Sequence, residues 1–83
     1  MPRYFFDVED NTGTHRDDVG LDLPDMDTAI LEGRRALADM SREALLQPAD
    51  DSLQILIRDG VDGPVRLALS MTTDRPHKDG AGS

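Results

Sequence analysis

Apolar and polar residues alternate along three stretches of the chain, which is the pattern of half-buried β-strands. These stretches are residues 2–9, 52–59 and 64–71. In each of them every second position is mostly apolar, so each strand has one face suited to a core. A turn at residues 10–13 leads to a short further strand that is expected to cover at least residues 15–17. The first two strands are therefore predicted to form a hairpin.

From residue 25 to residue 46 the apolar positions repeat with the 3.6-residue period of an amphipathic helix. Asp25 is the expected N-cap, because its carboxylate can accept from backbone N–H groups of the first turn. Pro48 disfavours helical geometry at the residue before it, so the helix is expected to end near Leu46. Gly33 lies inside the apolar stripe, where it costs about 1 kcal/mol relative to Ala. We attribute this glycine to a close approach of the helix to the sheet.

The element order β-β-α-β-β predicts an α+β fold, a four-stranded antiparallel sheet with one amphipathic helix packed on one face. Leu21 and Leu23, before the helix, are expected to be extended and buried. One domain is expected over residues 1–71, followed by a disordered polar tail at 72–83. The expected core consists of Tyr4, Phe6, Val8, Ile30, Leu37, Met40, Ile55, Ile57, Val65, Leu67 and Leu69.

Composition excludes several classes of protein. The 83 residues contain no Cys, so disulfides and Cys-ligated metals are excluded. A net charge of −8 argues against nucleic-acid binding through general electrostatics. No apolar run approaches the roughly 20 residues of a membrane helix, and no signal peptide is apparent, so a cytoplasmic protein is expected. The charge is local, because residues 7–27 hold eight acids against the single base Arg16, which gives −7.

Candidate catalytic and metal-binding residues are few. His15 is the only His before the polar tail, and an exposed strand position is the expected role for it. No Ser has the context of an activated nucleophile, so neither an enzyme nor a cofactor is expected. The acids of residues 7–27 could gather around calcium, but the calcium-loop pattern is absent. We expect these acids to keep strand edges soluble and to cap the helix, without a metal.

The face of the sheet opposite the helix is the first candidate interaction surface. One helix covers one face, so the other face would present Phe5, Leu56 and Ala68 to water, and exposed apolar patches usually mark interaction sites. Phe5 and Leu56 are expected to touch if their strands are neighbours. Arg34 and Arg35 give the helix a basic flank, which could dock an acidic partner or the acidic segment of a second copy.

Four short motifs resemble a small uncharacterised domain family that is common in alphaproteobacteria. They are Met-Pro-Arg-Tyr-Phe-Phe-Asp-Val at residues 1–8, Asp-Val-Gly at 18–20, Leu-Pro-Asp at 23–25 and Arg-Asp-Gly at 58–60. The resemblance covers roughly residues 1–71 and supports the fold. The family has no established activity that could be carried over to this chain.

We therefore expect a small non-catalytic protein-interaction or regulatory module that forms a homodimer or binds a protein partner. A thin core without disulfides or metal often needs association for stability, which favours self-association. An alternative is an antitoxin-like acidic domain that neutralises a basic partner.

Overall fold

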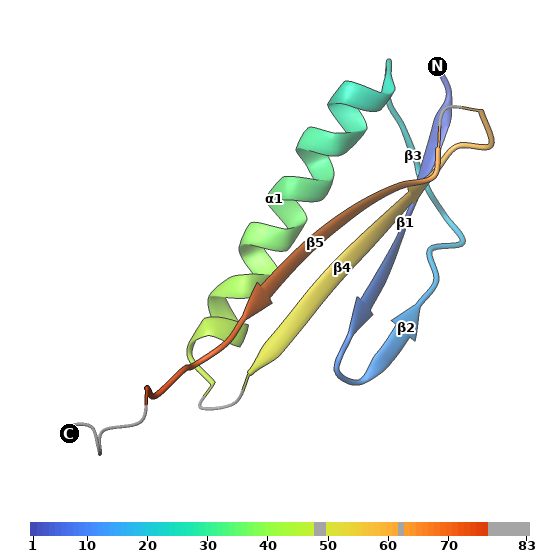
Figure 1. The fold of residues 1–83 in the computed structure, drawn as a ribbon. Coiled ribbons are helices and arrows are strands. Elements are labelled where there is room, and N and C mark those ends of the chain that lie inside the picture. The colour runs from blue at the N-terminus through green and yellow to red at the C-terminus, as the bar shows by residue number, and fades with distance from the viewer. Residues whose placement is uncertain (48–49, 62, 77–83) are drawn as a thin grey trace.

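The computed structural model describes residues 1–47, 50–61 and 63–76 of the chain. They form one long helix and a curved antiparallel sheet that lies along it (Figure 1). The elements, in chain order, are β1 (Arg3–Asp10), β2 (Gly13–His15), β3 (Leu21–Asp22), α1 (Met26–Leu45), β4 (Asp51–Arg58) and β5 (Val65–Met71). The α+β class predicted from the sequence is confirmed.

The strand order of the sheet is β2-β1-β4-β5, with antiparallel neighbours throughout. The two-residue strand β3 also pairs with β1, near its beginning, through Arg3 opposite Asp22 and Tyr4 opposite Leu21. One edge of β1 is thus shared by β2 and β3, while β4 occupies the other edge. At the far side of the sheet, β5 is an edge strand.

Two details of the first hairpin differ from the prediction. The second strand ends at His15 instead of continuing to residue 17, because the chain then leaves the ladder and returns to β1 only at β3. Leu21 was expected to be buried and is 47% exposed, since β3 lies at the sheet edge. Leu23 does pack against the core.

The helix begins and ends close to the predicted residues. The Oδ1 atom of Asp25 accepts a hydrogen bond from the backbone N–H of Thr28 at 2.8 Å, as expected of an N-cap. The hydrogen bond from the Thr28 hydroxyl, followed by this backbone bond, lowers the pKa of the Asp25 carboxyl. α1 ends at Leu45, one residue before the predicted end, and Leu46 is its C-cap.

The core lies between α1 and the central strands. Its buried apolar residues are Tyr4, Ala29, Leu37, Leu53, Ile55 and Ile57, and most other residues of the expected core pack around them half-buried. Leu69 was expected in the core and is 44% exposed. The reason is its position on the edge strand, where β4 covers one flank and no other described strand covers the second.

The segment after β5 is exposed through residue 76 and forms neither helix nor strand. One contact ties it to the domain, a hydrogen bond from the Thr73 N–H to Oδ1 of Asp50 at 2.9 Å. The rest of the predicted tail lies outside the described residues, and its disorder stays a prediction.

Gly33 supports the interpretation made from the sequence. It is buried, and a Cβ atom built on it would lie 2.7 Å from Cδ1 of Leu67 and 3.3 Å from Cδ1 of Ile57. The helix therefore approaches β4 and β5 more closely than a residue with a side chain would allow.

Replacing Gly33 with Val should destabilise the protein by about 2 kcal/mol, because overpacking outweighs the gain in helix propensity. The midpoint of urea unfolding measures the effect. Arg35→Val places the same side chain at an exposed position of the same helix and serves as the control. Equal midpoints for the two variants would contradict the close approach.

Candidate functional site

The open face of the sheet, opposite α1, carries an ion pair between Arg58 and Asp7. The guanidinium of Arg58 holds the Asp7 carboxylate in a two-pronged contact, with Nε to Oδ2 at 2.7 Å and Nη2 to Oδ1 at 3.0 Å. The Asp7 side chain is only 11% exposed. The hydrogen bonds from Arg58 lower the pKa of the Asp7 carboxyl, so the pair is charged at neutral pH.

Asp17 fills the gap that β2 and β3 leave along the edge of β1. Its Oδ2 atom accepts from the backbone N–H of Phe6 at 3.0 Å, where a strand neighbour would otherwise accept. Its Oδ1 atom accepts from the N–H groups of Val19 and Gly20 at 3.0 Å and 3.1 Å. These bonds, the one from Phe6 foremost, lower the pKa of the Asp17 carboxyl. A side chain thus takes the place of strand pairing.

The two acids and the arginine form one network. The N–H of Asp17 donates to Oδ1 of Asp7 at 2.9 Å, and Nη2 of Arg58 donates to the carbonyl oxygen of Asp17 at 3.1 Å. These carboxylates and the guanidinium are engaged in bonds that fix the backbone of the loop between β2 and β3. The network is structural, because its carboxylates accept hydrogen bonds from the chain itself and are not arranged as an acid–base pair that faces a substrate.

Two of the three apolar candidates of the open face are less exposed than expected. Phe5 and Leu56 do point to this face, but both are half-buried, and only Ala68 is exposed. Phe5 lies opposite Arg58 in the β1–β4 register, and the Arg58 guanidinium stands 5.1 Å from the centre of its ring. Leu56 lies opposite Asp7. The strands of Phe5 and Leu56 are neighbours, as the prediction of a patch required, and Arg58 lies over the ring of Phe5.

His15 is exposed at the end of β2, as expected. Its Nε2 atom lies 3.2 Å from the hydroxyl of Thr12 and 3.5 Å from Oδ1 of Asp10. Both contacts fall on one ring nitrogen, so they do not form the relay in which a histidine joins a nucleophile to an acid. Within the parts of the chain that the structure describes, no group of three or more His, Cys, Asp or Glu side chains could hold a metal ion.

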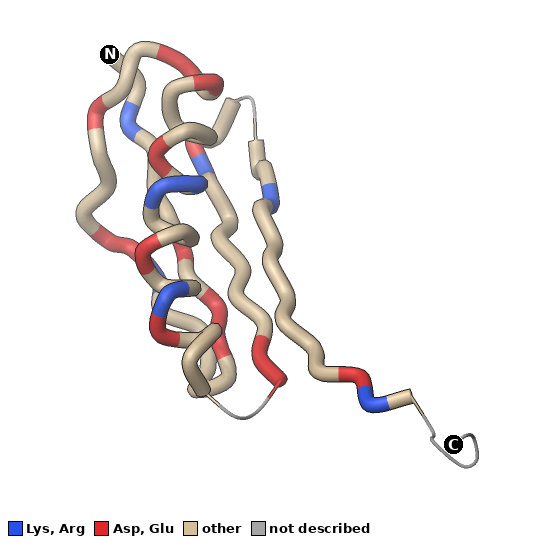
Figure 2. The backbone as a smooth tube through the Cα atoms, turned by 90° about the vertical axis from the view of Figure 1, so that its left-hand side faces the viewer, with Lys and Arg blue, Asp and Glu red and all other residues tan. Residues whose placement is uncertain are grey.

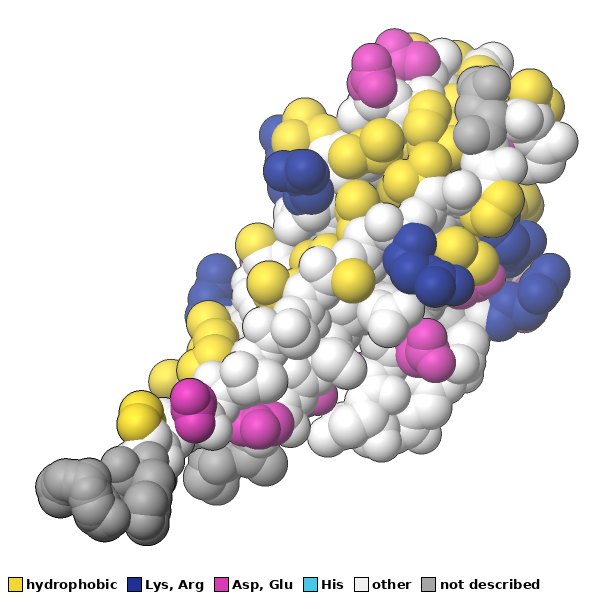
Figure 3. All heavy atoms as spheres, viewed as in Figure 1, with side chains coloured by type: hydrophobic (Ala, Val, Ile, Leu, Met, Phe, Trp, Pro, Cys, Tyr) yellow, Lys and Arg dark blue, Asp and Glu magenta, His cyan; other side chains and the backbone are white. Residues whose placement is uncertain are grey.

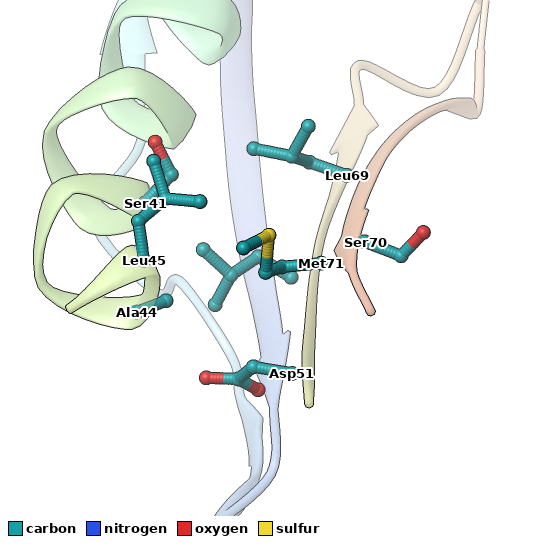
Figure 4. A pocket seen from close by; sticks show the side chains of 8 residues that line it. Ser41, Ala44, Leu45, Asp51, Leu69, Ser70 and Met71 are labelled. Atoms are coloured by element: carbon teal, nitrogen blue, oxygen red, sulfur yellow. The ribbon is translucent and has the colours of Figure 1, made fainter. Parts of the chain in front are cut away.

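Four of the nine exposed large apolar residues that the structure describes belong to α1 and the edge strand β5, and hydrophobic side chains lie along both elements in Figure 3. A groove runs between the two elements. In its lower part, Leu69 and Met71 of β5 point toward Ser41 and Leu45 of α1, while Ser70 points away (Figure 4). We call this region the α1/β5 surface; it consists of Arg34, Ala38, Ser41, Leu45, Leu69 and Met71, together with Leu31, which the helical period places on the same flank of α1 as Ala38.

The α1/β5 surface is apolar and open. Leu31, Leu45, Leu69 and Met71 are all among the large apolar residues that the structure leaves exposed, at 49%, 51%, 44% and 37%. The part of the groove beside Leu45 has a volume of about 100 Å³, enough for one or two side chains of a partner.

The two arginines of the predicted basic flank take different directions. Arg34 lines the groove beside Leu67 and Leu69, and no ion-pair partner is found for it among the described residues. Arg35 is exposed and lies 3.6 Å from Glu32 one turn earlier. The interaction roles predicted for Arg34, Arg35, Phe5, Leu56 and Ala68 stay predictions.

Sequence reasoning overlooked most of the α1/β5 surface. Leu31 and Leu45 lie off the main apolar stripe of the helix, which was a usable signal of a second apolar face. Leu69 and Met71 follow the alternation of a buried strand, so only the strand order could show that they lie at an open edge. Asp17 was recognised as an acid of the hairpin, but nothing in its neighbours pointed to its role beside Phe6.

A comparison with family models places residues 3–79 in a domain of unknown function, DUF6894. The chain belongs to this family. The match confirms the resemblance to an uncharacterised small domain family and extends it beyond residue 71. Comparisons with curated proteins and with solved structures gave no match. Among the described residues no helix is long and apolar enough to cross a membrane.

Removing the Asp17 carboxylate should destabilise the fold at neutral pH and weaken its sensitivity to acid. The folded pKa values of Asp7 and Asp17 lie below the unfolded value of about 3.9. Their contribution to stability is therefore complete above that pH and is lost as the pH falls through the folded values. Asp17→Ala should cost about 2 kcal/mol at pH 7, and its stability should fall less steeply below about pH 4.

Urea unfolding at a series of pH values measures both effects. Asp18→Ala is the matched control, since Asp18 is 85% exposed and its ion pair with Arg16 spans 3.7 Å. The control should stay within about 0.5 kcal/mol of the wild type. Equal losses in the two variants would contradict the role of Asp17 in the ladder.

Proposed function

We propose that this chain is a small non-catalytic protein-interaction or regulatory module that self-associates, and that it does so through the α1/β5 surface. The observation that carries the proposal is that the edge of β5, which no other described strand pairs with, lies beside a cluster of exposed leucines and a methionine. Apolar side chains gathered in this way are typical of an interaction surface.

The absence of a built catalytic site among the described residues is consistent with a binding role but does not carry it. The positive support is energetic. An 83-residue chain has a thin core, and covering Leu45 and Leu69 would add apolar burial that the monomer lacks. Each of these side chains would contribute about 1 kcal/mol if association buried its exposed half.

The antitoxin-like alternative draws on the acidic residues 7–27. Several of these carboxylates already bind groups of their own chain, which leaves them less free to imitate a phosphate backbone. Asp7 binds Arg58, Asp17 binds backbone N–H groups, and Asp22 binds Arg3 through Nε at 2.9 Å. We therefore favour the self-associating module.

Leu45→Lys should weaken self-association and leave the fold intact. The new ammonium would be buried in the interface, which should raise the dissociation constant of the dimer about tenfold or more. In the monomer a Lys in the last turn of a helix is favourable. Sedimentation velocity over a concentration series measures association, and circular dichroism checks the fold.

Val19→Lys is the matched control, because Val19 is an exposed apolar residue on the far side of the sheet. It should associate like the wild type. A wild type that stays monomeric at every concentration would contradict the proposed function, whereas a dimer that Leu45→Lys leaves unchanged would contradict the α1/β5 surface as its site.

A further inference from the structure

The outer edge of β5 offers backbone donors and acceptors that no other described strand uses. β5 is seven residues long and, among the strands that the structure describes, pairs with β4 alone. An edge strand of this length is a template for a further strand, and natural proteins usually protect such edges with charges or prolines. Within β5 the only charged residue is Arg66.

The direction of the backbone groups follows from the ladder. In an antiparallel sheet successive residues direct their N–H and C=O groups to opposite neighbours. Phe6 directs its N–H away from β4, to the carboxylate of Asp17. The next residue, Asp7, therefore directs its backbone toward its partner on β4, Leu56.

The same alternation continues into β5. Ile55 turns away from β1 and toward Leu67, its partner on β5. Leu67 uses its backbone groups in this pair. Arg66 and Ala68 on either side of it, and then Ser70, direct theirs outward, to the unpaired edge.

We propose that a second copy of this chain pairs with this edge, β5 against β5 in antiparallel orientation, with the two-fold axis at Ala68. The proposal rests on the proposed function, since it names the partner of the same surface. Ala68 then faces Ala68 of the second copy, and Arg66 faces Ser70. All three outward-facing residues thereby gain a partner, and the smallest side chain lies on the axis.

On the face of β5 that is directed to α1, this register sets apolar side chains of the two copies opposite each other. Val65, Leu67, Leu69 and Met71 all point to the α1 side, and the pairing sets Val65 opposite Met71 and Leu67 opposite Leu69. Apolar side chains that are half exposed in one copy thus form a continuous row across the seam. Cross-strand apolar pairs of this kind stabilise a sheet.

The α1 helices of the two copies can also be related by this two-fold axis. Ala38 lines the groove at the level of Leu67 and Leu69, close to the level of Ala68. Leu31 and Leu45 lie about two turns before and after Ala38 on the same flank. A two-fold axis at this level therefore brings Leu31 of each copy opposite Leu45 of the other.

The spacing of the helices is also suitable. α1 packs on both β4 and β5. With strands about 4.8 Å apart, a helix between β4 and β5 lies about 5 Å from the seam. The axes of the two helices would then be about 10 Å apart, which is an ordinary packing distance, and shorter contacts are possible where the facing residue is Ala.

Charge favours a second copy at this edge over the opposite one. The −7 of residues 7–27 lies on β1, the loops around β2 and β3, and the start of α1, whereas β5 is nearly free of charge (Figure 2). Two copies joined through β5 keep their acidic edges at the far ends of the joined sheet. Joined through β2, they would bring like charges together.

The area of such an interface sets its expected strength. A strand of seven residues is about 23 Å long, and a helix on a sheet is about 20 Å thick, so the seam covers roughly 500 Å² per copy. The total of roughly 1,000 Å² is at the lower limit of specific interfaces. We therefore expect a reversible dimer that dissociates on dilution.

Two variants that place opposite charges at the axis test the register of the two β5 strands. Ala68 is exposed, so Ala68→Glu and Ala68→Lys should both fold. Each variant alone sets like charges directly opposite each other and should raise the dissociation constant of the dimer about tenfold. A mixture of the two should form a heterodimer at least as tight as the wild-type dimer, measured by sedimentation velocity with one variant labelled.

The results separate the two proposals. Association that neither variant weakens, or two weakened variants whose mixture does not recover, would overturn the axis at Ala68 while a wild-type dimer still supports the proposed function. If dimer formation recovers only in the double variant Ala68→Glu, Ser70→Lys, residue 68 faces residue 70 of the second copy. The axis would then lie at Leu69. A wild type that is monomeric at every concentration overturns both, and would leave the edge to a different protein.

Discussion

One helix has to cover a sheet that is four strands wide, and this constraint decides which parts of the molecule are closed and which stay open. α1 has 20 residues and packs on β4 and β5, with the core between them and Tyr4 of β1. A helix is about 10 Å wide, so it cannot cover the whole helix-side face of four strands. Its closest approach depends on Gly33, which lets the helix lie against Leu67.

The two edges of the sheet are treated differently. Along β1, the gap between β2 and β3 is closed by the Asp17 carboxylate, and the Asp7–Arg58 pair ties that loop to the sheet. Two of the acids of residues 7–27, Asp7 and Asp17, thus have a structural use at this edge, and the charge of the others favours its solubility. β5 has neither a side chain in its ladder nor a cluster of charges. The edge of β1 is closed by a side chain and is acidic, whereas the edge of β5 is open and carries little charge. This difference is the main reason to expect association at β5.

Much of the fold could be predicted from local patterns. Alternation identified the long strands, the 3.6-residue period identified α1, and Asp25 identified its start. Strand order could not be predicted, since nothing local distinguishes a central from an edge strand when both alternate in the same way. For that reason Leu69 was expected in the core. The contact of Arg58 with the ring of Phe5 could not be predicted either, because the two residues are far apart in sequence.

The measurement that tests the account most directly is amide hydrogen exchange along β5 at different protein concentrations. The N–H groups of Leu67 and Leu69 are bonded to β4 and should be protected at every concentration. The N–H of Ala68 should be protected at high concentration and become exchangeable on dilution, as the dimer dissociates. Rapid exchange of the Ala68 N–H at all concentrations, beside protected neighbours, would contradict pairing at this edge.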